Sequence, residues 1–172
     1  MKRNFFLLFL CLLPYHSFAS ESPYEFKEIN LRILPALETV VSGPTGYGSS
    51  SSIGGQMTYF LRPWGALNLS YQYTQFDPSS VHRAGGGPLI RVLDSTYFRA
   101  EIEGHASYVR TLGKNNFGWG GTAYLSSPFR KFSWVPFVGP FIAYDHTYLT
   151  GKNLKSATVG LMIALTGNAD FD

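Results

Sequence analysis

The residues best suited to chemistry lie at alternate positions between Arg99 and Ser107, where arginine, glutamate, glutamate, histidine and serine follow one another. In a β-strand, residues two apart share one face. A histidine and a serine beside a carboxylate are the parts of a base-activated nucleophile. The same row can also supply paired charges to a buried polar core. Which solvent this face meets decides between the two interpretations.

The other parity of the same stretch, residues 97–109, is apolar. Its members are Phe98, Ala100, Ile102, Gly104, Ala106 and Tyr108. We therefore expect a strand with one charged and one apolar face. In a soluble antiparallel sheet, the charged face would point at water. If the pattern recurs around a closed sheet, the apolar faces need lipid and the charged faces enclose a lumen.

The N-terminus has the features of a secretory signal peptide. Two basic residues precede an apolar run over 5–13, and small residues at Ser17 and Ala19 fit a cleavage site. We expect a signal peptide over 1–19 and a barrel domain over 20–172. The apolar run is shorter than the roughly 20 residues of a spanning helix. It contains the only cysteine, so we expect neither a disulfide nor a cysteine metal site in the mature chain.

The composition favours strands in a bilayer and argues against several other classes. Charged residues make up 15% of the chain and aromatic residues 16%, with 18 glycines, as expected of membrane strands with aromatic girdles and glycine-rich turns. Basic residues form no cluster interleaved with aromatics, so no nucleic-acid partner is expected. The alanine and glycine run over 84–87 lacks the ending of a phosphate-binding loop. His82 and His146 fall short of the about four ligands of a zinc site, so no metal or cofactor is expected.

Alternation of apolar and polar residues predicts eight strands. They cover residues 28–41, 53–61, 67–74, 88–93, 97–109, 117–125, 134–148 and 156–165. The short 88–93 segment is included because single-chain bacterial barrels have an even number of strands. Two prolines and a glycine interrupt the parity of 134–148, so the facing of that strand is not assigned. Segments 43–52 and 77–87 are predicted to be long outer loops.

The last strand places a polar residue, a glycine and two hydrophobic residues at Thr158, Gly160, Ile163 and Leu165. This spacing resembles the assembly signal of outer-membrane barrels, although the chain continues past the strand to Phe171. The layout as a whole resembles small outer-membrane barrels of the OmpA/OmpX type. The resemblance implies an all-β fold, a closed antiparallel up-and-down transmembrane β-barrel in the cell outer membrane. It also implies a monomer that is inserted by the barrel-assembly machinery and surrounded by outer-membrane lipid and lipopolysaccharide.

Parity predicts a polar network inside this barrel. Its members are Arg32, Glu38, Arg91, Arg99, Glu101, Glu103 and His105. About eight strands leave a lumen just wide enough for side chains to fill, so we expect a salt-bridged plug in which Glu103 pairs with Arg99 or another cation. No catalytic residue is assigned. The expected role is structural, or an interaction at the cell surface through the extracellular loops.

Three alternatives remain open at this point. A narrow, porin-like conducting path can run through the lumen. A lipid A-modifying hydrolase can use His105 with Ser107, or Asp145 with His146, although such a site must face acyl chains rather than the lumen. A soluble periplasmic lipocalin-like protein would turn the apolar row that begins at Leu67 inward, toward an apolar ligand.

Overall fold

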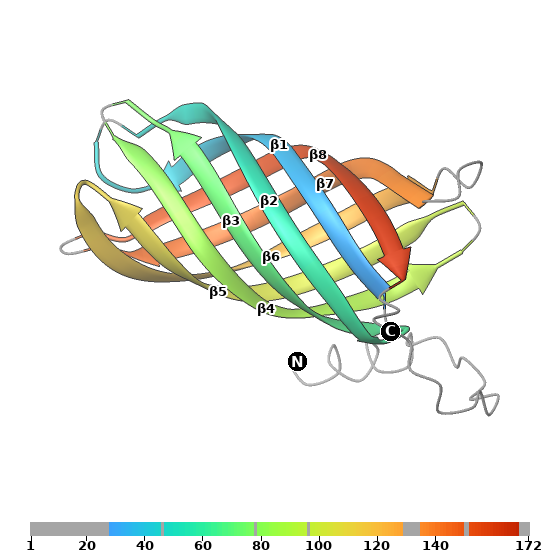
Figure 1. Cartoon of the computed structure of the whole chain (residues 1–172). Coiled ribbons are helices and arrows are strands. Elements are labelled where there is room, and N and C mark those ends of the chain that lie inside the picture. Colours follow the sequence, from blue (N-terminus) through green and yellow to red (C-terminus); the bar gives the residue numbers. More distant parts are fainter. Residues whose placement is uncertain are drawn as a thin grey trace, which may run out of the picture.

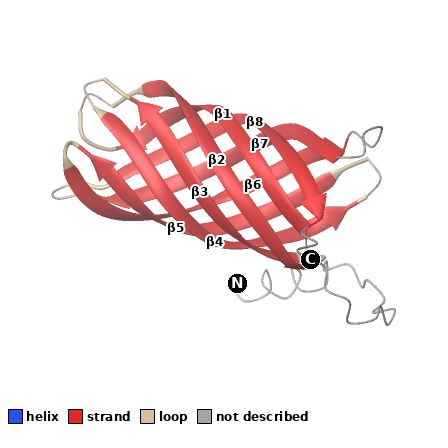
Figure 2. Ribbon diagram, viewed as in Figure 1, coloured by secondary structure: helices blue, strands red, loops and turns tan. Residues whose placement is uncertain are grey.

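The computed structural model describes residues 28–45, 47–77, 79–95, 97–128, 135–149 and 152–168, and they form one closed barrel (Figure 1). The strands are β1 (Glu28–Ser42), β2 (Ser49–Arg62), β3 (Gly65–Gln75), β4 (Ser80–Asp94), β5 (Arg99–Thr111), β6 (Lys114–Pro128), β7 (Val135–Tyr148) and β8 (Leu154–Asn168). Each pairs antiparallel with the next, and β8 pairs with β1 (Figure 2). The predicted signal peptide and Phe171 lie outside the described residues.

Closure brings the start of β1 and the finish of β8 to one end of the barrel, where Glu28 is in register with Asn168. We call this the terminal end. The opposite, distal end carries the connections 43–48, 76–79, 112–113 and 149–153. The part of the chain that the structure describes contains no helix long and apolar enough to cross a membrane.

The strands turn their apolar residues outward and their polar residues inward. On β3, Leu67 and Leu69 are 55% and 62% exposed, whereas Asn68 is 3% exposed. On β5, Ile102 faces outward while Glu101 and Glu103 are buried. The lipocalin-like arrangement is therefore wrong, because it required the opposite facing. The structure also gives the facing of β7, which the sequence left unassigned. Phe137, Phe141 and Asp145 point inward, and Ile142 and Tyr144 point outward.

An apolar band encircles the outer surface between two sets of aromatic residues. The band contains Leu31, Ile33, Leu37, Ile53, Met57, Leu67, Leu69, Ile90, Ile102, Ile142, Val159, Leu161, Ile163 and Leu165. Exposed aromatics lie toward the distal end at Tyr71, Tyr108, Phe117, Trp119, Tyr144 and Tyr148, and at the terminal end at Trp64, Tyr97 and Phe98. Aromatic side chains at these two levels suit the two interfaces of a bilayer.

The predicted loops over 43–52 and 77–87 are shorter in the structure than expected. Residues Ser49 to Ser52 belong to β2, and the alanine and glycine run over 84–87 lies inside β4. Glycine is needed there for close strand contact rather than for mobility. A methyl group on Gly87 would lie 2.1 Å from the backbone oxygen of Gly104 on β5. The distal connections are consequently only two to six residues long.

The tightest distal connection joins β5 to β6 through Leu112 and Gly113, with φ angles of 52° and 70°. Two residues with positive φ match the twist of a β-hairpin. A branched leucine is disfavoured in this conformation, whereas asparagine tolerates it.

Replacing Leu112 by asparagine should therefore raise the free energy of unfolding by about 1 kcal/mol. Urea unfolding of the barrel in detergent micelles tests this. Leu112→Ala is the matched control, since it also removes the exposed apolar side chain but keeps the unfavourable backbone preference. An equal gain from both substitutions would show that exposure, not backbone strain, is responsible.

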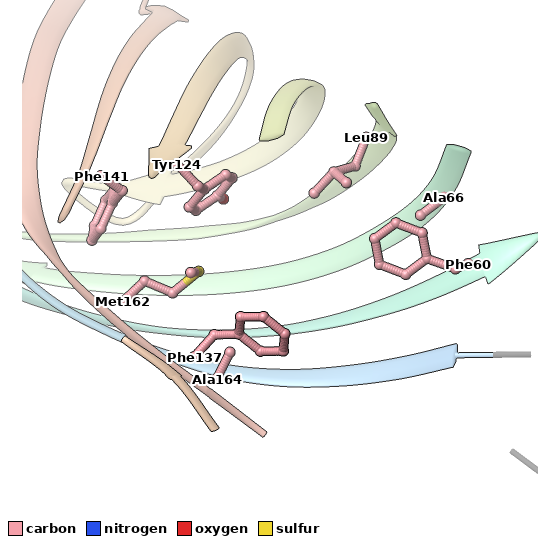
Figure 3. Close-up of a cluster of buried hydrophobic side chains, with 8 residues drawn as sticks. All are labelled: Phe60, Ala66, Leu89, Tyr124, Phe137, Phe141, Met162 and Ala164. Atoms are coloured by element: carbon pink, nitrogen blue, oxygen red, sulfur yellow. The ribbon is translucent and has the colours of Figure 1, made fainter. Parts of the chain in front are cut away.

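Side chains fill the lumen. A cluster of inward-facing apolar residues occupies the terminal half: Phe60, Ala66, Leu89, Tyr124, Phe137, Phe141, Met162 and Ala164 (Figure 3). A second cluster closes the distal mouth, where Phe76, Val81, Val109 and Leu154 are buried. Ionisable residues lie between and among these two clusters.

Candidate functional site

The lumen holds nine buried arginine, glutamate and aspartate residues from β1, β4, β5 and β7 of the described chain. They are the arginines Arg32, Arg83, Arg91 and Arg99 and the acids Glu28, Glu38, Glu101, Glu103 and Asp145. The structure places all seven predicted members on the inner face, with His105 half-buried. An uncompensated buried charge is costly, so the contacts of each group decide what the site can do.

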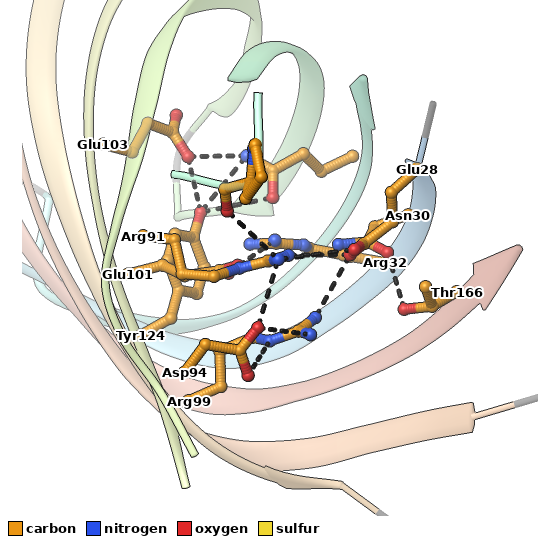
Figure 4. Close-up of polar contacts among 12 residues, drawn as sticks. Glu28, Asn30, Arg32, Arg91, Asp94, Arg99, Glu101, Glu103, Tyr124 and Thr166 are labelled. Atoms are coloured by element: carbon orange, nitrogen blue, oxygen red, sulfur yellow. Dashed lines mark hydrogen bonds and ion pairs between the residues drawn. The ribbon is translucent and has the colours of Figure 1, made fainter. Parts of the chain in front are cut away.

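The first ionic group lies toward the terminal end (Figure 4). Glu101 accepts hydrogen bonds from Arg32 at 2.6 Å and from Arg91 at 3.2 Å. Arg91 also reaches Glu28 at 2.7 Å, and Glu28 accepts a bond from Arg99 at 3.2 Å. Charges of alternating sign are thus linked across the lumen between β1, β4 and β5.

Aromatic rings cover the arginines of this group. The guanidinium of Arg91 lies 4.0 Å from the ring centroid of Phe60, and that of Arg99 lies 3.8 Å from Phe137. Contact between a guanidinium and a ring face is attractive and is stronger where water is excluded. The apolar and ionic parts of the lumen are therefore one packed core.

The second ionic group lies nearer the distal end and is centred on Glu38. Arg83 donates to both oxygens of this carboxylate, at 2.8 and 2.6 Å. Thr74 and Gln72 donate to it at 2.5 and 3.2 Å. A bidentate arginine with two further donors compensates a carboxylate that is fully buried.

His105 joins two acids between these groups. Its Nε2 lies 2.9 Å from Asp145 and its Nδ1 lies 3.1 Å from Glu103. Glu103 also accepts hydrogen bonds from Gln56 at 2.6 Å and Tyr124 at 2.7 Å. Of the partners expected for Glu103, Arg99 is not the one observed, since it contacts Glu28 and Asp94, and the ring of His105 lies beside Glu103 instead.

These contacts argue against both hydrolase sites considered from the sequence. A catalytic base needs a ring nitrogen free to take the proton of its nucleophile, and both nitrogens of His105 are held by carboxylates rather than by Ser107. Asp145 is buried in the lumen, whereas His146 points outward and packs against Trp119 and Tyr148, with ring centroids 5.5 and 4.7 Å apart. This neighbouring pair lies on opposite faces of the wall.

Several members of the network were missed from the sequence. Arg83 has the same parity as Arg91, but the alanine and glycine run that follows it is typical of a loop. Glu28 was placed at the start of a strand without a facing, and Asp145 lies in the strand whose parity proline and glycine obscure. The alternation of residues 88–93, continued toward the N-terminus, is the one sequence signal that would place Arg83 on the inner face of β4.

The distal mouth is closed above the network. Tyr47, from the β1–β2 connection, packs on Phe76 with ring centroids 5.3 Å apart, and its hydroxyl lies 2.9 Å from Thr111 Oγ1. A cavity of about 50 Å³ remains among Gln56, Arg83 and His105. This volume has room for ordered water but is far below the roughly 300–1,000 Å³ of ligand pockets.

Within the described ranges, no group of three or more histidine, cysteine, aspartate or glutamate residues is arranged to hold a metal ion. The predicted assembly residues lie on β8. Thr158 is buried, whereas Ile163 and Leu165 are exposed on the outer surface. Gly160 has a packing role of its own, since a methyl group there would lie 2.5 Å from Ala36 Cβ. Recognition of these residues by assembly machinery stays a prediction.

Comparison with known proteins identifies the fold. The chain matches no family model, and no curated protein is significantly similar to it. Among solved structures, Neisserial surface protein A (NspA) superposes with a TM-score of 0.62 at 11% identity, covering 81% of this chain and 96% of that chain. The outer membrane protein OprG from Pseudomonas aeruginosa gives a TM-score of 0.56 at 7% identity, covering 84% and 98%. The architecture is therefore that of small bacterial outer-membrane barrels.

Proposed function

We propose that this barrel is an integral protein of the bacterial outer membrane, with a plugged lumen and a structural or surface-interaction role. The proposal rests on the difference between the two faces of the barrel wall. Buried charges are confined to the lumen, and the outward positions between the aromatic girdles of the described strands carry no Asp, Glu, Lys or Arg. Lipid is the environment that such a surface requires.

The even number of strands puts both ends of the barrel domain on one side of the membrane. In the orientation usual for such barrels, the terminal end faces the periplasm and the distal end faces outside. Insertion by the barrel-assembly machinery, a monomeric state and contact with lipopolysaccharide belong to the same proposal. Since the distal connections are short, a surface partner would meet a shallow rim rather than long loops.

The membrane assignment predicts a boiling-dependent gel shift. Membranes from expressing cells are extracted in detergent and run on a gel with and without boiling. The unboiled barrel should migrate as a compact, faster band. Release of the protein in soluble form by osmotic shock would contradict membrane insertion.

The plugged lumen predicts no conductance. Planar-bilayer recordings of the purified barrel should show no stable steps, because the distal apolar cluster and the ionic groups fill the path. A monomeric channel-forming barrel measured in the same bilayers is the control. Reproducible single-channel steps would contradict a plugged lumen while leaving the membrane assignment intact.

A further inference from the structure

A groove of about 260 Å³ is recessed into the outer surface of β3, β4 and β5. It is lined by Tyr71, His82, Ala84, Tyr108 and Arg110. The lining combines two tyrosines at the level of the distal girdle with two nitrogen-bearing side chains nearer the distal end. The groove lies outside the lumen and is separate from the network that plugs it.

Small residues continue the floor of the groove toward the middle of the apolar band. On β4, Ala84 is in register with Tyr108 of β5, and Gly86 with Ala106. Gly104 follows on β5, and a methyl group there would meet nothing within 4 Å. A larger side chain would therefore fit at residue 104 without a clash. Because glycine stands there, this space above the sheet is left open. The resulting furrow leads from the girdle into the band.

The distal end of the groove is polar and positively charged. His82 and Arg110 are in register on β4 and β5. Hydrogen bonds fix the ring of His82, since Tyr71 Oη lies 2.7 Å from Nδ1 and Ser80 Oγ lies 3.3 Å from Nε2. Arg110 is exposed, and no carboxylate of the described residues lies within ion-pairing distance of it. This arginine differs from the four lumen arginines, each of which has an acid partner.

We propose that this groove binds lipid A, with one acyl chain along the furrow and a phosphate on Arg110. The proposal rests on the membrane orientation proposed above, which places the distal girdle in the outer leaflet. A furrow floored by small residues fits an acyl chain, and an unpaired guanidinium at its polar end fits a phosphate, which arginine can bind in a bidentate manner. His82 forms the polar wall of the groove beside Arg110, held by Tyr71 and Ser80.

Native mass spectrometry of the barrel released from detergent can test the site with three probes: bis-phosphorylated lipid A, dephosphorylated lipid A and phosphatidylglycerol. Arg110→Ala should weaken binding of bis-phosphorylated lipid A about tenfold, the loss of one charge-assisted contact, and leave the dephosphorylated form unchanged. Ala84→Trp should weaken both forms by blocking the furrow. Lys155→Ala is the matched control, because this cation lies on β8, on the far side of the barrel from β4.

The outcomes separate this proposal from the membrane assignment. Every variant is first required to keep the gel shift on boiling, and failure of the wild type at that step counts against the membrane assignment. With the barrel intact, an equal loss of lipid A binding in Arg110→Ala and Lys155→Ala would overturn the proposal that the groove is the binding site. Equal binding of phosphatidylglycerol would overturn its assignment to lipid A. Recovery of lipid A that has lost an acyl chain would make Ser80 and His82 a nucleophile and base, and would overturn a site that only binds.

Discussion

Replacing Glu101 by alanine should lower the free energy of unfolding by about 3–5 kcal/mol. This carboxylate is 2% exposed and holds two buried arginines, Arg32 at 2.6 Å and Arg91 at 3.2 Å. Without it, Arg32 keeps no acid partner among its described contacts, and the lumen retains a buried charge. Urea unfolding in detergent micelles or lipid vesicles, followed by tryptophan fluorescence, measures the loss.

Asp94 provides a matched control for that experiment. It contacts Arg91 at 3.2 Å and Arg99 at 3.1 Å, but its side chain is 38% exposed at the terminal mouth. Solvent screens such a pair, so Asp94→Ala should cost less than about 1 kcal/mol. If both substitutions had the same small effect, the charges in the lumen would be hydrated rather than packed.

Replacing Gly87 by alanine should lower the free energy of unfolding by about 3 kcal/mol or more, the upper range for overpacking. The added methyl group would lie 2.1 Å from the backbone oxygen of Gly104 and 3.0 Å from His105 Cα. Neither backbone atom can turn away as a flexible side chain can, so β4 and β5 must separate. The fraction of chain that refolds into the fast-migrating form in detergent measures this effect.

Gly55→Ala is the control for the glycine experiment. Gly55 faces outward on β2, and a methyl group there would meet nothing within 4 Å. This substitution should change the refolded fraction little, because it brings no backbone clash. Equal refolding of both variants would show that β4 and β5 leave room for a methyl group at residue 87.

The sequence predicts the all-β class and the inward or outward facing of many residues. It does so because apolar and polar residues alternate on β1, β3 and β5, whose two faces meet different environments. Inward placement of Glu38, Arg91 and Glu101 follows from that parity alone. The partner of each charge does not, since parity gives no information on which strands face each other across the lumen. The contacts of Arg83 with Glu38 and of His105 with Asp145 depend on that three-dimensional arrangement.

The main error of the sequence prediction is the length of β4, which was predicted too short. This error has a physical cause. A run of alanine and glycine carries no apolar signal on either face, so it looks the same in a mobile loop as in a closely packed strand. Only the neighbouring backbone, at Gly104 and Ala106, shows that the run lies against another strand. Arg83 and its bidentate pairing with Glu38 were lost with that segment.

With the distal end facing outside, as proposed above, the short distal connections limit what other molecules can reach on an intact cell. Between two and six residues join each pair of strands at that end. Proteases and antibodies generally engage several residues of an exposed segment, and these connections present few. Intact cells treated with a broad-specificity protease should therefore keep the barrel uncut, and an epitope tag inserted between Gly43 and Gly48 should make it visible to antibody.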